Sequence, residues 1–199
     1  MINRPYKLGL TGSIGMGKST TANLFRELGI PVWDADAAVA ALYEKEGAAV
    51  PLISAVLPDA IRDGAVDRAA LKNKIAVDPE VLRTLEKIVH PLVQADRKAF
   101  AKVNSTAPIL IFDIPLLFET NGDAEMDGVL VVTTSPDEQR RRVLDRGQMT
   151  EAEFEIILSR QLPDLEKRAR ADYVLETNSI DQTRADVVAL IKKLEAKNA

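Results

Sequence analysis

Short apolar runs alternate along the chain with longer stretches whose apolar residues recur at three- and four-residue intervals. The first pattern predicts buried β-strands, and the second predicts amphipathic helices that cover them. The runs that we interpret as strands are residues 7–11, 32–34, 109–113, 129–133 and 173–176. Because strands that alternate with helices favour parallel pairing, the sequence predicts an α/β fold with a parallel sheet.

A glycine-rich turn at residues 12–17 joins the first strand to the first helix. Apolar residues on one face predict that this helix covers about residues 18–28, with Gly29 at its C-cap and Pro31 preventing its continuation. A second strand follows at once. The pattern of strand, helix and strand within about thirty residues indicates a βαβ unit.

Residues 36–105 differ, because alanine, leucine and charged residues recur there at helical spacing. Glycines and prolines interrupt this stretch, and Asp78 followed by Pro79 predicts the start of a helix. We expect several helices and no clear strand. The stretch is too long for one crossover helix, so we interpret it as an inserted helical lobe.

Capping boxes mark two helix starts in the last third of the chain, at residues 135–138 and 150–153. Residues 179–182 are expected to open a final helix that continues to about Leu194.

The composition is that of a globular protein: of 199 residues, 46% are hydrophobic and 28% are charged. The net charge of -4 argues against a dedicated nucleic-acid or anionic-membrane binder. Cysteine is absent, which excludes disulfides, cysteine–zinc sites and thiol nucleophiles. Because we find no apolar signal core and no apolar run that could span a bilayer, we expect a soluble, cytoplasmic protein.

Residues 12–19 match the phosphate-binding pattern G-x-x-x-x-G-K-[ST]. Glycines let backbone amides turn towards phosphate oxygens, and the positive end of the following helix strengthens the site. Lys18 is expected on the β- and γ-phosphates and the Ser19 hydroxyl on Mg²⁺. A chance glycine turn is the alternative, but the flanking strand and helix argue against it. We therefore predict a nucleoside triphosphate site at Gly12, Ser13, Ile14, Gly15, Met16, Gly17, Lys18, Ser19 and Thr20.

Asp34 and Asp36 follow the second strand and share a face of an extended backbone. Ligands of open α/β sheets lie at the carboxyl ends of the strands, so one of these carboxylates is a candidate base for an attacking hydroxyl. The alternative is a helix N-cap. From the residues alone, Asp36 is about equally well explained as a base and as an N-cap. For Asp34, capping or a contact with Mg²⁺-bound water is favoured.

Arginine is concentrated in the segment from residue 140 to residue 170. One interpretation is a mobile lid whose arginines close on the triphosphate. The other, which we favour for most of these arginines, is a solvated helical hairpin held by ion pairs four residues apart. Arg142 and Arg146 share a helix face and are the two that we expect to reach the phosphates. The full set is Arg140, Arg141, Arg142, Arg146, Arg160, Arg168 and Arg170.

Four other residues give weaker signals. Asp113 ends an apolar strand and is a candidate for holding Mg²⁺ through water, with a surface carboxylate as the alternative. Glu119 is a comparable candidate. His90 is the only histidine, and we interpret it as a helix-end or core residue. Trp33 is expected in the core.

The phosphate loop does not belong to a GTPase, because the nearest match to the guanine motif N-K-x-D, at residues 73–76, lacks the aspartate. A motor or transporter ATPase would need more chain. The class that remains is a small kinase acting on a hydroxyl or phosphate acceptor.

Several blocks of the chain resemble the dephospho-CoA kinase family. They are residues 10–19, residues 29–32 leading into D-A-D at 34–36, H-P-L at 90–92, P-L-L-F-E at 115–119, residues 139–146, and A-D-Y-V at 171–174 with Asn178 just after. These blocks keep the family's order and spacing and cover nearly the whole chain.

The resemblance implies a P-loop nucleoside-kinase-like fold in a single domain, residues 1–199. A five-stranded parallel core (1–36, 106–138 and 171–199) would carry a helical lobe that binds the CoA moiety (about 37–105) and a lid (about 139–170). The implied reaction is ATP-dependent phosphorylation of the ribose 3′-hydroxyl of dephospho-CoA, the last step of CoA synthesis, with Mg²⁺ as cofactor. ATP and dephospho-CoA are the expected partners, and we expect a monomer or weak homo-oligomer.

The same resemblance makes Asp36 the proposed base, Arg142 and Arg146 lid arginines, and Asn178 part of the adenine-binding loop. The chain departs from the family at Ala40, where many members have arginine, and at Gly147, where many have aspartate or asparagine.

Two other functions stay open. One is another small-molecule kinase of this fold, acting on a nucleoside monophosphate or an alcohol. The other is a nucleotide-binding regulatory module without an acceptor. The long helical insert favours a bulky acceptor, and the acidic pair and the arginines have no role in a regulatory module.

Overall fold

The computed structural model describes residues 4–147 and 149–198. The chain divides into two units, the first formed by residues 1–33 and 104–199 and the second by residues 34–103. Within the described residues, no helix combines the length and apolar character needed to cross a membrane.

A sheet of five strands organises the first unit, in the order β2-β5-β1-β6-β7. The strands β1, β5, β6 and β7 pair in parallel, with Leu8 opposite Ile111 and Leu10 opposite Leu130. Every residue of β5 and β6 is buried, as expected for strands covered on both faces. The five strands predicted from the sequence are confirmed: β1 Tyr6–Thr11, β2 Val32–Asp34, β5 Ile109–Asp113, β6 Gly128–Thr133 and β7 Tyr173–Glu176.

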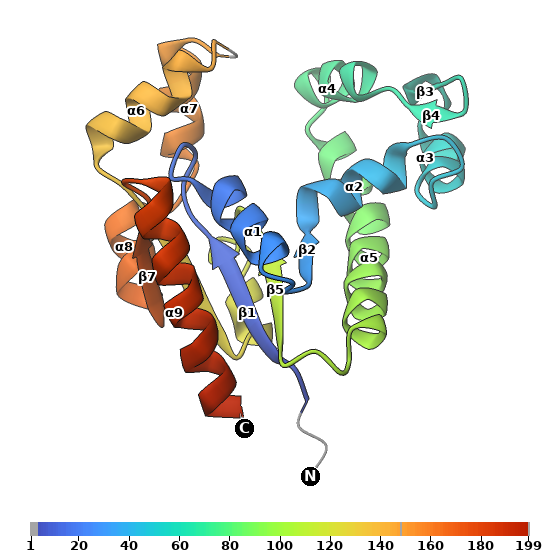
Figure 1. Cartoon of the computed structure of the whole chain (residues 1–199). Helices are drawn as coiled ribbons and strands as arrows, with labels where there is room; N and C mark the ends of the chain where they lie inside the picture. Colours follow the sequence, from blue (N-terminus) through green and yellow to red (C-terminus); the bar gives the residue numbers. More distant parts are fainter. Residues whose placement is uncertain (1–3, 148, 199) are drawn as a thin grey trace. The chain divides into compact units, whose positions relative to one another are not determined.

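Helices cover both faces of this sheet (Figure 1). Helix α1 packs against α9 on one face, and α8 packs against β6 on the other. Buried apolar side chains from β1, β5, β6, α1 and α9 form the main core. The helices of the first unit are α1 Lys18–Glu27, α6 Pro136–Asp145, α7 Glu151–Ser159, α8 Asp164–Arg170 and α9 Ile180–Asn198, with a 3₁₀ turn at Gly122–Glu125.

The capping motifs predicted from the sequence are observed at the helix starts, with one difference at α6. The capping box at Thr150 is complete, and Ser179 Oγ accepts a hydrogen bond from the Gln182 amide at the start of α9. At α6 only half of the expected box forms: Ser135 Oγ accepts from the Glu138 amide, whereas the Glu138 carboxylate accepts from arginines. Helix α9 also continues beyond the predicted end at Leu194.

The second unit is mainly helical, with its own apolar core around Ile53, Leu71 and Leu85. The expectation that it holds no strand is wrong, because β3 and β4 form a short antiparallel hairpin. Asp63 and Gly64 occupy its two turn positions with φ of 53° and 81°, the left-handed backbone that a two-residue hairpin requires. Its elements are α2 Ala35–Tyr43, α3 Val50–Val56, a 3₁₀ turn at Pro58–Ala60, β3 Ile61–Arg62, β4 Ala65–Val66, α4 Arg68–Val77 and α5 Glu80–Val103.

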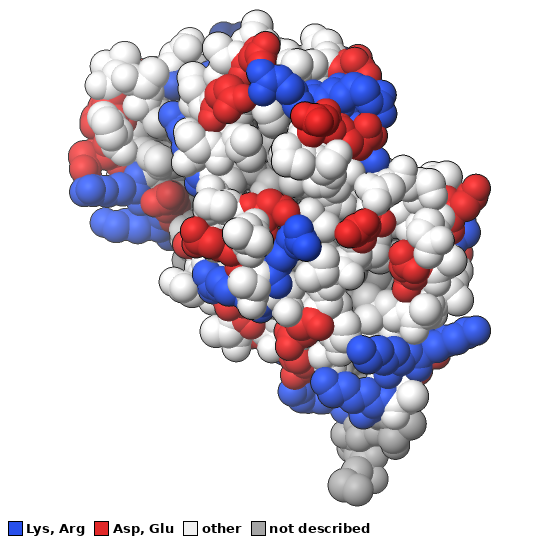
Figure 2. All heavy atoms as spheres, turned by 90° about the vertical axis from the view of Figure 1, so that its left-hand side faces the viewer, with Lys and Arg blue, Asp and Glu red and all other residues white. Residues whose placement is uncertain are grey.

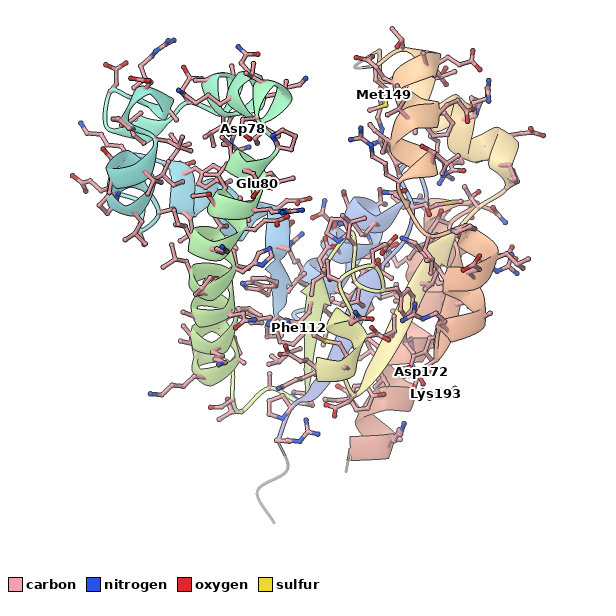
Figure 3. All side chains as sticks on the ribbon, turned by 180° about the vertical axis from the view of Figure 1, so that it is seen from behind. Asp78, Glu80, Phe112, Met149, Asp172 and Lys193 are labelled. Carbon is pink, nitrogen blue, oxygen red and sulfur yellow. The ribbon has the colours of Figure 1, made fainter. Side chains whose placement is uncertain are left out.

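The expectation that His90 lies at a helix end or in the core is wrong. His90 is exposed in the middle of α5, which continues through Pro91. The predicted start of this helix is close to the observed one: Asp78 Oδ1 accepts a hydrogen bond from the Glu80 amide at 2.9 Å, and Figure 3 shows both side chains at the first turn.

In the first unit, Trp33 is buried as expected, with its ring centroid 6.2 Å from that of Phe112.

Candidate active site

The phosphate loop lies between the carboxyl end of β1 and the first turn of α1. Gly15 and Gly17 have φ of 79° and 90°, a conformation that side-chain-bearing residues rarely adopt. A Cβ atom on Gly15 would lie 2.6 Å from Val143 Cγ2, and one on Gly17 would lie 2.8 Å from Thr177 Oγ1. The glycines are therefore required both by the turn and by the side chains packed around it.

The start of α1 is prepared to receive an anion. Gly17 is its N-cap and makes no side-chain capping bond, and the first turn contains no acidic residue. The amides and the positive end of the helix dipole are thus not satisfied by a side chain at this end. Ser19 and Thr20 are exposed in the same turn, so their hydroxyls are accessible to a ligand.

Lys18 forms an ion pair with Asp113, the carboxylate that ends β5. Its Nζ lies 2.6 Å from Asp113 Oδ1, and the two side chains are 16% and 2% exposed. A carboxylate this deeply buried needs a partner, because unpaired buried charge is costly. The surface-carboxylate alternative for Asp113 is therefore wrong. The pair fixes the ammonium group at the carboxyl edge of the sheet.

Three side chains from distant parts of the chain hold the backbone of the loop. Gln139 Nε2 donates to Ile14 O at 2.7 Å, and Gln161 Oε1 accepts from Ile14 N at 3.0 Å. Thr177 Oγ1 donates to Met16 O at 2.9 Å. Sequence reasoning did not single out these residues for a role, because a glutamine or threonine in a helix or loop carries no local signal for a partner more than a hundred residues away.

The two predicted lid arginines have different surroundings. Arg142 is half-buried, and its guanidinium donates to Thr177 Oγ1 at 2.9 Å, to Thr177 O at 2.5 Å and to Glu138 at 2.7 Å. It thus contacts the same threonine that holds the phosphate loop. Arg146 is exposed at the C-cap of α6.

Acidic side chains bind several of the other arginines. Arg141 pairs with Glu138 and Asp145 on its own helix, whereas Arg140 pairs with Glu151 and Glu155 of α7. Hydrogen bonds from Arg141 and Arg142 lower the pKa of Glu138 to about 2. On the face drawn in Figure 2, positive and negative side chains are interspersed, as in the ion-paired hairpin interpretation.

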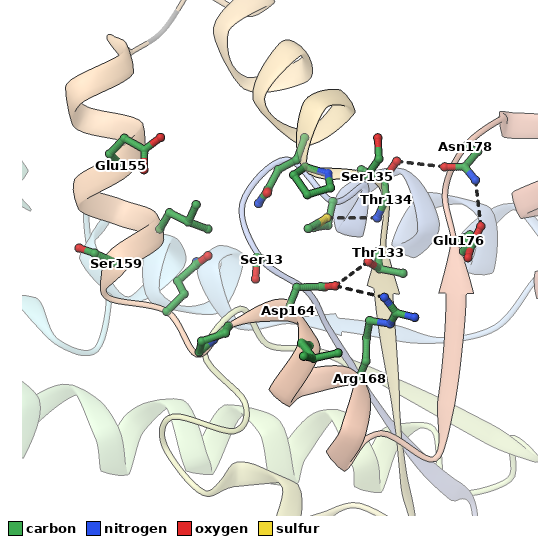
Figure 4. Close-up of a pocket in the computed structure, with 17 residues that line it drawn as sticks. Ser13, Thr133, Thr134, Ser135, Glu155, Ser159, Asp164, Arg168, Glu176 and Asn178 are labelled. Carbon is green, nitrogen blue, oxygen red and sulfur yellow. Dashed lines mark hydrogen bonds and ion pairs between the residues drawn. The ribbon is translucent and has the colours of Figure 1, made fainter.

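Asn178 lies just after β7, beside a cavity of about 840 Å³ (Figure 4). Its Oδ1 accepts from Thr134 Oγ1 at 3.0 Å, and its Nδ2 donates to Glu176 at 3.0 Å. Ser13 and Met16 of the phosphate loop line the same cavity. The structure therefore brings Asn178 and the loop to one place within the first unit.

Glu119, predicted as a candidate for Mg²⁺, is bound to protein groups. Its Oε1 lies 2.9 Å from Nζ of the buried Lys167 and accepts from the Leu162 amide at 2.8 Å. Burial alone would raise the pKa of Glu119, but the hydrogen bonds from Lys167 and Leu162 hold this pKa below its ordinary value. The carboxylate joins the loop after β5 to the connection between α7 and α8.

The second unit holds the acidic pair. Asp34 is the N-cap of α2, and its Oδ1 accepts from the Ala37 amide at 3.0 Å. This is the capping role favoured for Asp34, and it removes that role from Asp36. Asp36 lies in the first turn of α2 with an exposed carboxylate.

No group of three or more acidic, histidine or cysteine side chains among the described residues could hold a metal ion by itself. A cation at this site would need oxygen atoms from a ligand as well as from the protein. Mg²⁺ is commonly bound in this way, by one or two protein oxygens, water and substrate phosphates.

The chain is similar to known dephospho-CoA kinases. The family model for dephospho-CoA kinase (CoaE) matches residues 6–182. The dephospho-CoA kinase of Jannaschia sp. (strain CCS1) is 61% identical over 189 residues, which cover 95% of this chain and 97% of the relative.

Two solved structures share the fold. The crystal structure of TT1252 from Thermus thermophilus is 36% identical with a TM-score of 0.82, covering 94% of this chain and 97% of that one. Dephospho-CoA kinase from Campylobacter jejuni is 20% identical with a TM-score of 0.67, covering 96% of this chain and 97% of that one. The predicted five-stranded parallel sheet flanked by helices is confirmed.

Proposed function

Because the chain belongs to the dephospho-CoA kinase family, we propose that it transfers the γ-phosphoryl group of ATP to the ribose 3′-hydroxyl of dephospho-CoA. The product is CoA, and the reaction is the last step of CoA synthesis. The observation that carries this function is the phosphate loop, whose Lys18 is held at 2.6 Å from a buried carboxylate at the carboxyl edge of a parallel sheet.

The triphosphate binds to the amides of residues 12–19 and to Lys18. This ammonium is largely buried and is positioned by Asp113, so little reorganisation is needed when the β- and γ-phosphates arrive. Contact with the phosphates would share or replace the contact with Asp113. Arg142 and Arg146 contribute positive charge as negative charge develops on the transferred group.

The exposed Ser19 hydroxyl would hold Mg²⁺, as the serine or threonine of this motif does in P-loop sites. The ion would neutralise charge on the β- and γ-phosphates. Asn178 is placed beside the phosphate loop and is assigned to the adenine end of ATP.

Transfer requires a base for the acceptor hydroxyl. The 3′-oxygen forms a bond to the γ-phosphorus, the bond from that phosphorus to the β–γ bridging oxygen breaks, and ADP leaves. Asp36 accepts the proton of the 3′-hydroxyl. Its exposed carboxylate, which does not cap α2, is free for this task. The second unit is assigned to the CoA moiety.

An acceptor panel tests the proposal. The purified protein is incubated with Mg·ATP and one acceptor at a time: dephospho-CoA, a nucleoside monophosphate, shikimate or gluconate. Phosphorylated products are identified by mass spectrometry. We expect transfer to dephospho-CoA alone. Transfer only to another acceptor would leave a P-loop kinase with a different substrate, and nucleotide binding without transfer would favour a regulatory module.

A further inference from the structure

The tip of the phosphate loop is held by two glutamines from the segment that follows β6. Gln139 comes from α6, and Gln161 lies in the connection between α7 and α8. Gln139 Nε2 donates to Ile14 O at 2.7 Å, and Gln161 Oε1 accepts from Ile14 N at 3.0 Å. Both backbone groups of one loop residue are thus bound by side chains outside the loop.

The surroundings of these bonds indicate a built contact. Gln139 is 4% exposed, so its amide was taken out of water to reach Ile14. A Cβ atom on Gly15 would lie 2.9 Å from Gln139 O, which shows that the loop and α6 approach as closely as glycine allows. A buried amide in such a place needs its hydrogen bond, since an unsatisfied one is costly.

The base of the connection that carries Gln161 is also fixed. Its next residue, Leu162, donates its amide to Glu119 Oε1 at 2.8 Å, and the same oxygen pairs with the buried Lys167 at 2.9 Å. This anchor sets where Gln161 can reach. The connection borders the cavity of Figure 4, which both glutamines line, so its other side is not packed against protein.

We propose that Gln139 and Gln161 are positioning residues that hold the phosphate loop in its nucleotide-receiving shape and couple that shape to the placement of α6 to α8. Neither glutamine is assigned a contact with substrate. Gln139 acts as a donor to the loop and Gln161 as an acceptor, so the two positions have opposite chemical requirements. The inference rests on the proposed nucleotide site, but not on the identity of the acceptor.

Glutamate substitutions separate this role from simple packing. Gln161→Glu keeps an acceptor for the Ile14 amide, whereas Gln139→Glu removes the donor and places a carboxylate against the Ile14 carbonyl. Gln161→Met and Gln139→Met keep a side chain of similar length but remove its hydrogen bond to Ile14. Gln182→Met, on the exposed side of α9, is the matched control because Gln182 bonds to Asp186 and not to the loop.

The first readout is hydrogen exchange of the Ile14 amide in nucleotide-free protein, measured by NMR. We expect exchange about tenfold faster in Gln161→Met and little change in Gln161→Glu and Gln182→Met. The second readout is the KM for Mg·ATP, which should rise about fivefold in both methionine variants and more in Gln139→Glu, since one hydrogen bond contributes that order of affinity. The KM for dephospho-CoA should not change.

Equal effects of glutamate at the two positions would overturn the proposal, as would an unchanged Ile14 exchange rate in Gln161→Met. If a Gln139 variant fails to fold, the Gln161 pair with the exchange readout still decides. A chain that binds Mg·ATP but phosphorylates another acceptor would contradict the proposed function and leave this inference standing.

Discussion

Lys18 has two roles in this molecule, because the group proposed to bind phosphate also compensates a buried charge. Asp113 is 2% exposed and ends a strand whose residues are all buried. Removing the ammonium leaves this carboxylate without its nearest cation. A loss of activity on substitution therefore has to be separated from a loss of stability.

Lys18→Met is expected to reduce turnover at least about a hundredfold and to lower the free energy of unfolding by about 3 kcal/mol, the usual cost of breaking a buried ion pair. Lys18→Met combined with Asp113→Asn should recover most of the stability and none of the activity. Urea unfolding and initial rates provide the two measurements. An active double variant would show that Lys18 does not contact the transferred phosphate.

Gly17 gives a second test at the residue scale. Gly17→Ala places a methyl group 2.8 Å from Thr177 Oγ1 and forces φ of 90° on alanine, so nucleotide affinity should fall at least tenfold. Gly29→Ala is the matched control, since Gly29 has a φ of 78° but nothing within 4 Å of an added Cβ. Backbone strain should cost each variant about 1 kcal/mol of stability, and the close contact with Thr177 should add to the loss in Gly17→Ala. Equal nucleotide affinity in the two would contradict the importance of the close approach.

Local signals explain which site residues could be predicted. The phosphate loop is contiguous, so its glycines, Lys18 and Ser19 are recognisable from spacing alone, and Asp113 is recognisable as a carboxylate at the end of an apolar run. Gln161 and Thr177 act only through the folding of distant segments against the loop. Periodicity and composition carry no information about such contacts. The chemical roles assigned to the predicted residues stay predictions.

At the scale of elements, the ion pair between Glu119 and Lys167 attaches α8 to the loop after β5. Lys167 is fully buried and Glu119 is 16% exposed. The same carboxylate holds the Leu162 amide at the end of the α7–α8 connection. One buried pair therefore fixes Leu162, and the residue before it, Gln161, reaches the phosphate loop.

Lys167→Met should lower the free energy of unfolding by about 2–3 kcal/mol, because Glu119 is left partly buried without its cation. Adding Glu119→Gln should restore part of this loss. Arg184→Met is the control, since its ion pair with Glu27 is largely exposed and should contribute less than about 1 kcal/mol. Chemical denaturation measures all three, and a Lys167 variant as stable as the control would contradict the role of the pair.

The pH dependence of stability follows from the same carboxylate. The pKa of Glu119 is lowered in the folded protein from its ordinary value of 4.5. Because the pKa of Glu119 is lower in the folded protein than in the unfolded chain, the stabilisation is complete above pH 4.5. It is lost as the pH falls below 4.5 towards the folded-state pKa. The stability of the wild type should therefore fall more steeply below pH 4.5 than that of Glu119→Gln, as measured by urea unfolding at a series of pH values. Parallel curves would contradict this assignment.

Element lengths explain where the sequence misled us. Long periodic segments such as α1 and α9 were predicted, but β3 and β4 have two residues each and cannot show a period. Gly64 is one of the glycines interpreted from the sequence as interruptions of the helical stretch, whereas with Asp63 it forms the hairpin turn. Helix α5 continues through Pro91, although proline usually ends a helix, so His90 lies on an exposed helix surface.

At the scale of the whole molecule, the phosphate loop, Lys18 and the arginines lie in the first unit, and the acidic pair begins the second. The sheet and the family were predicted because their motifs span the chain. The binding surface for the CoA arm has no contiguous motif, so neither periodicity nor spacing identifies its residues.

CoA is the proposed product of this chain. The most direct measurement is the product formed by purified protein with Mg·ATP and dephospho-CoA, identified by mass spectrometry and by ³¹P NMR for the position of the new phosphate. The Lys18→Met/Asp113→Asn protein, expected to fold, serves as the inactive control. We predict CoA phosphorylated on the 3′-oxygen, with one ADP formed per CoA. The control should form no CoA. Consumption of ATP without formation of CoA, or phosphate on another oxygen, would contradict the proposed reaction.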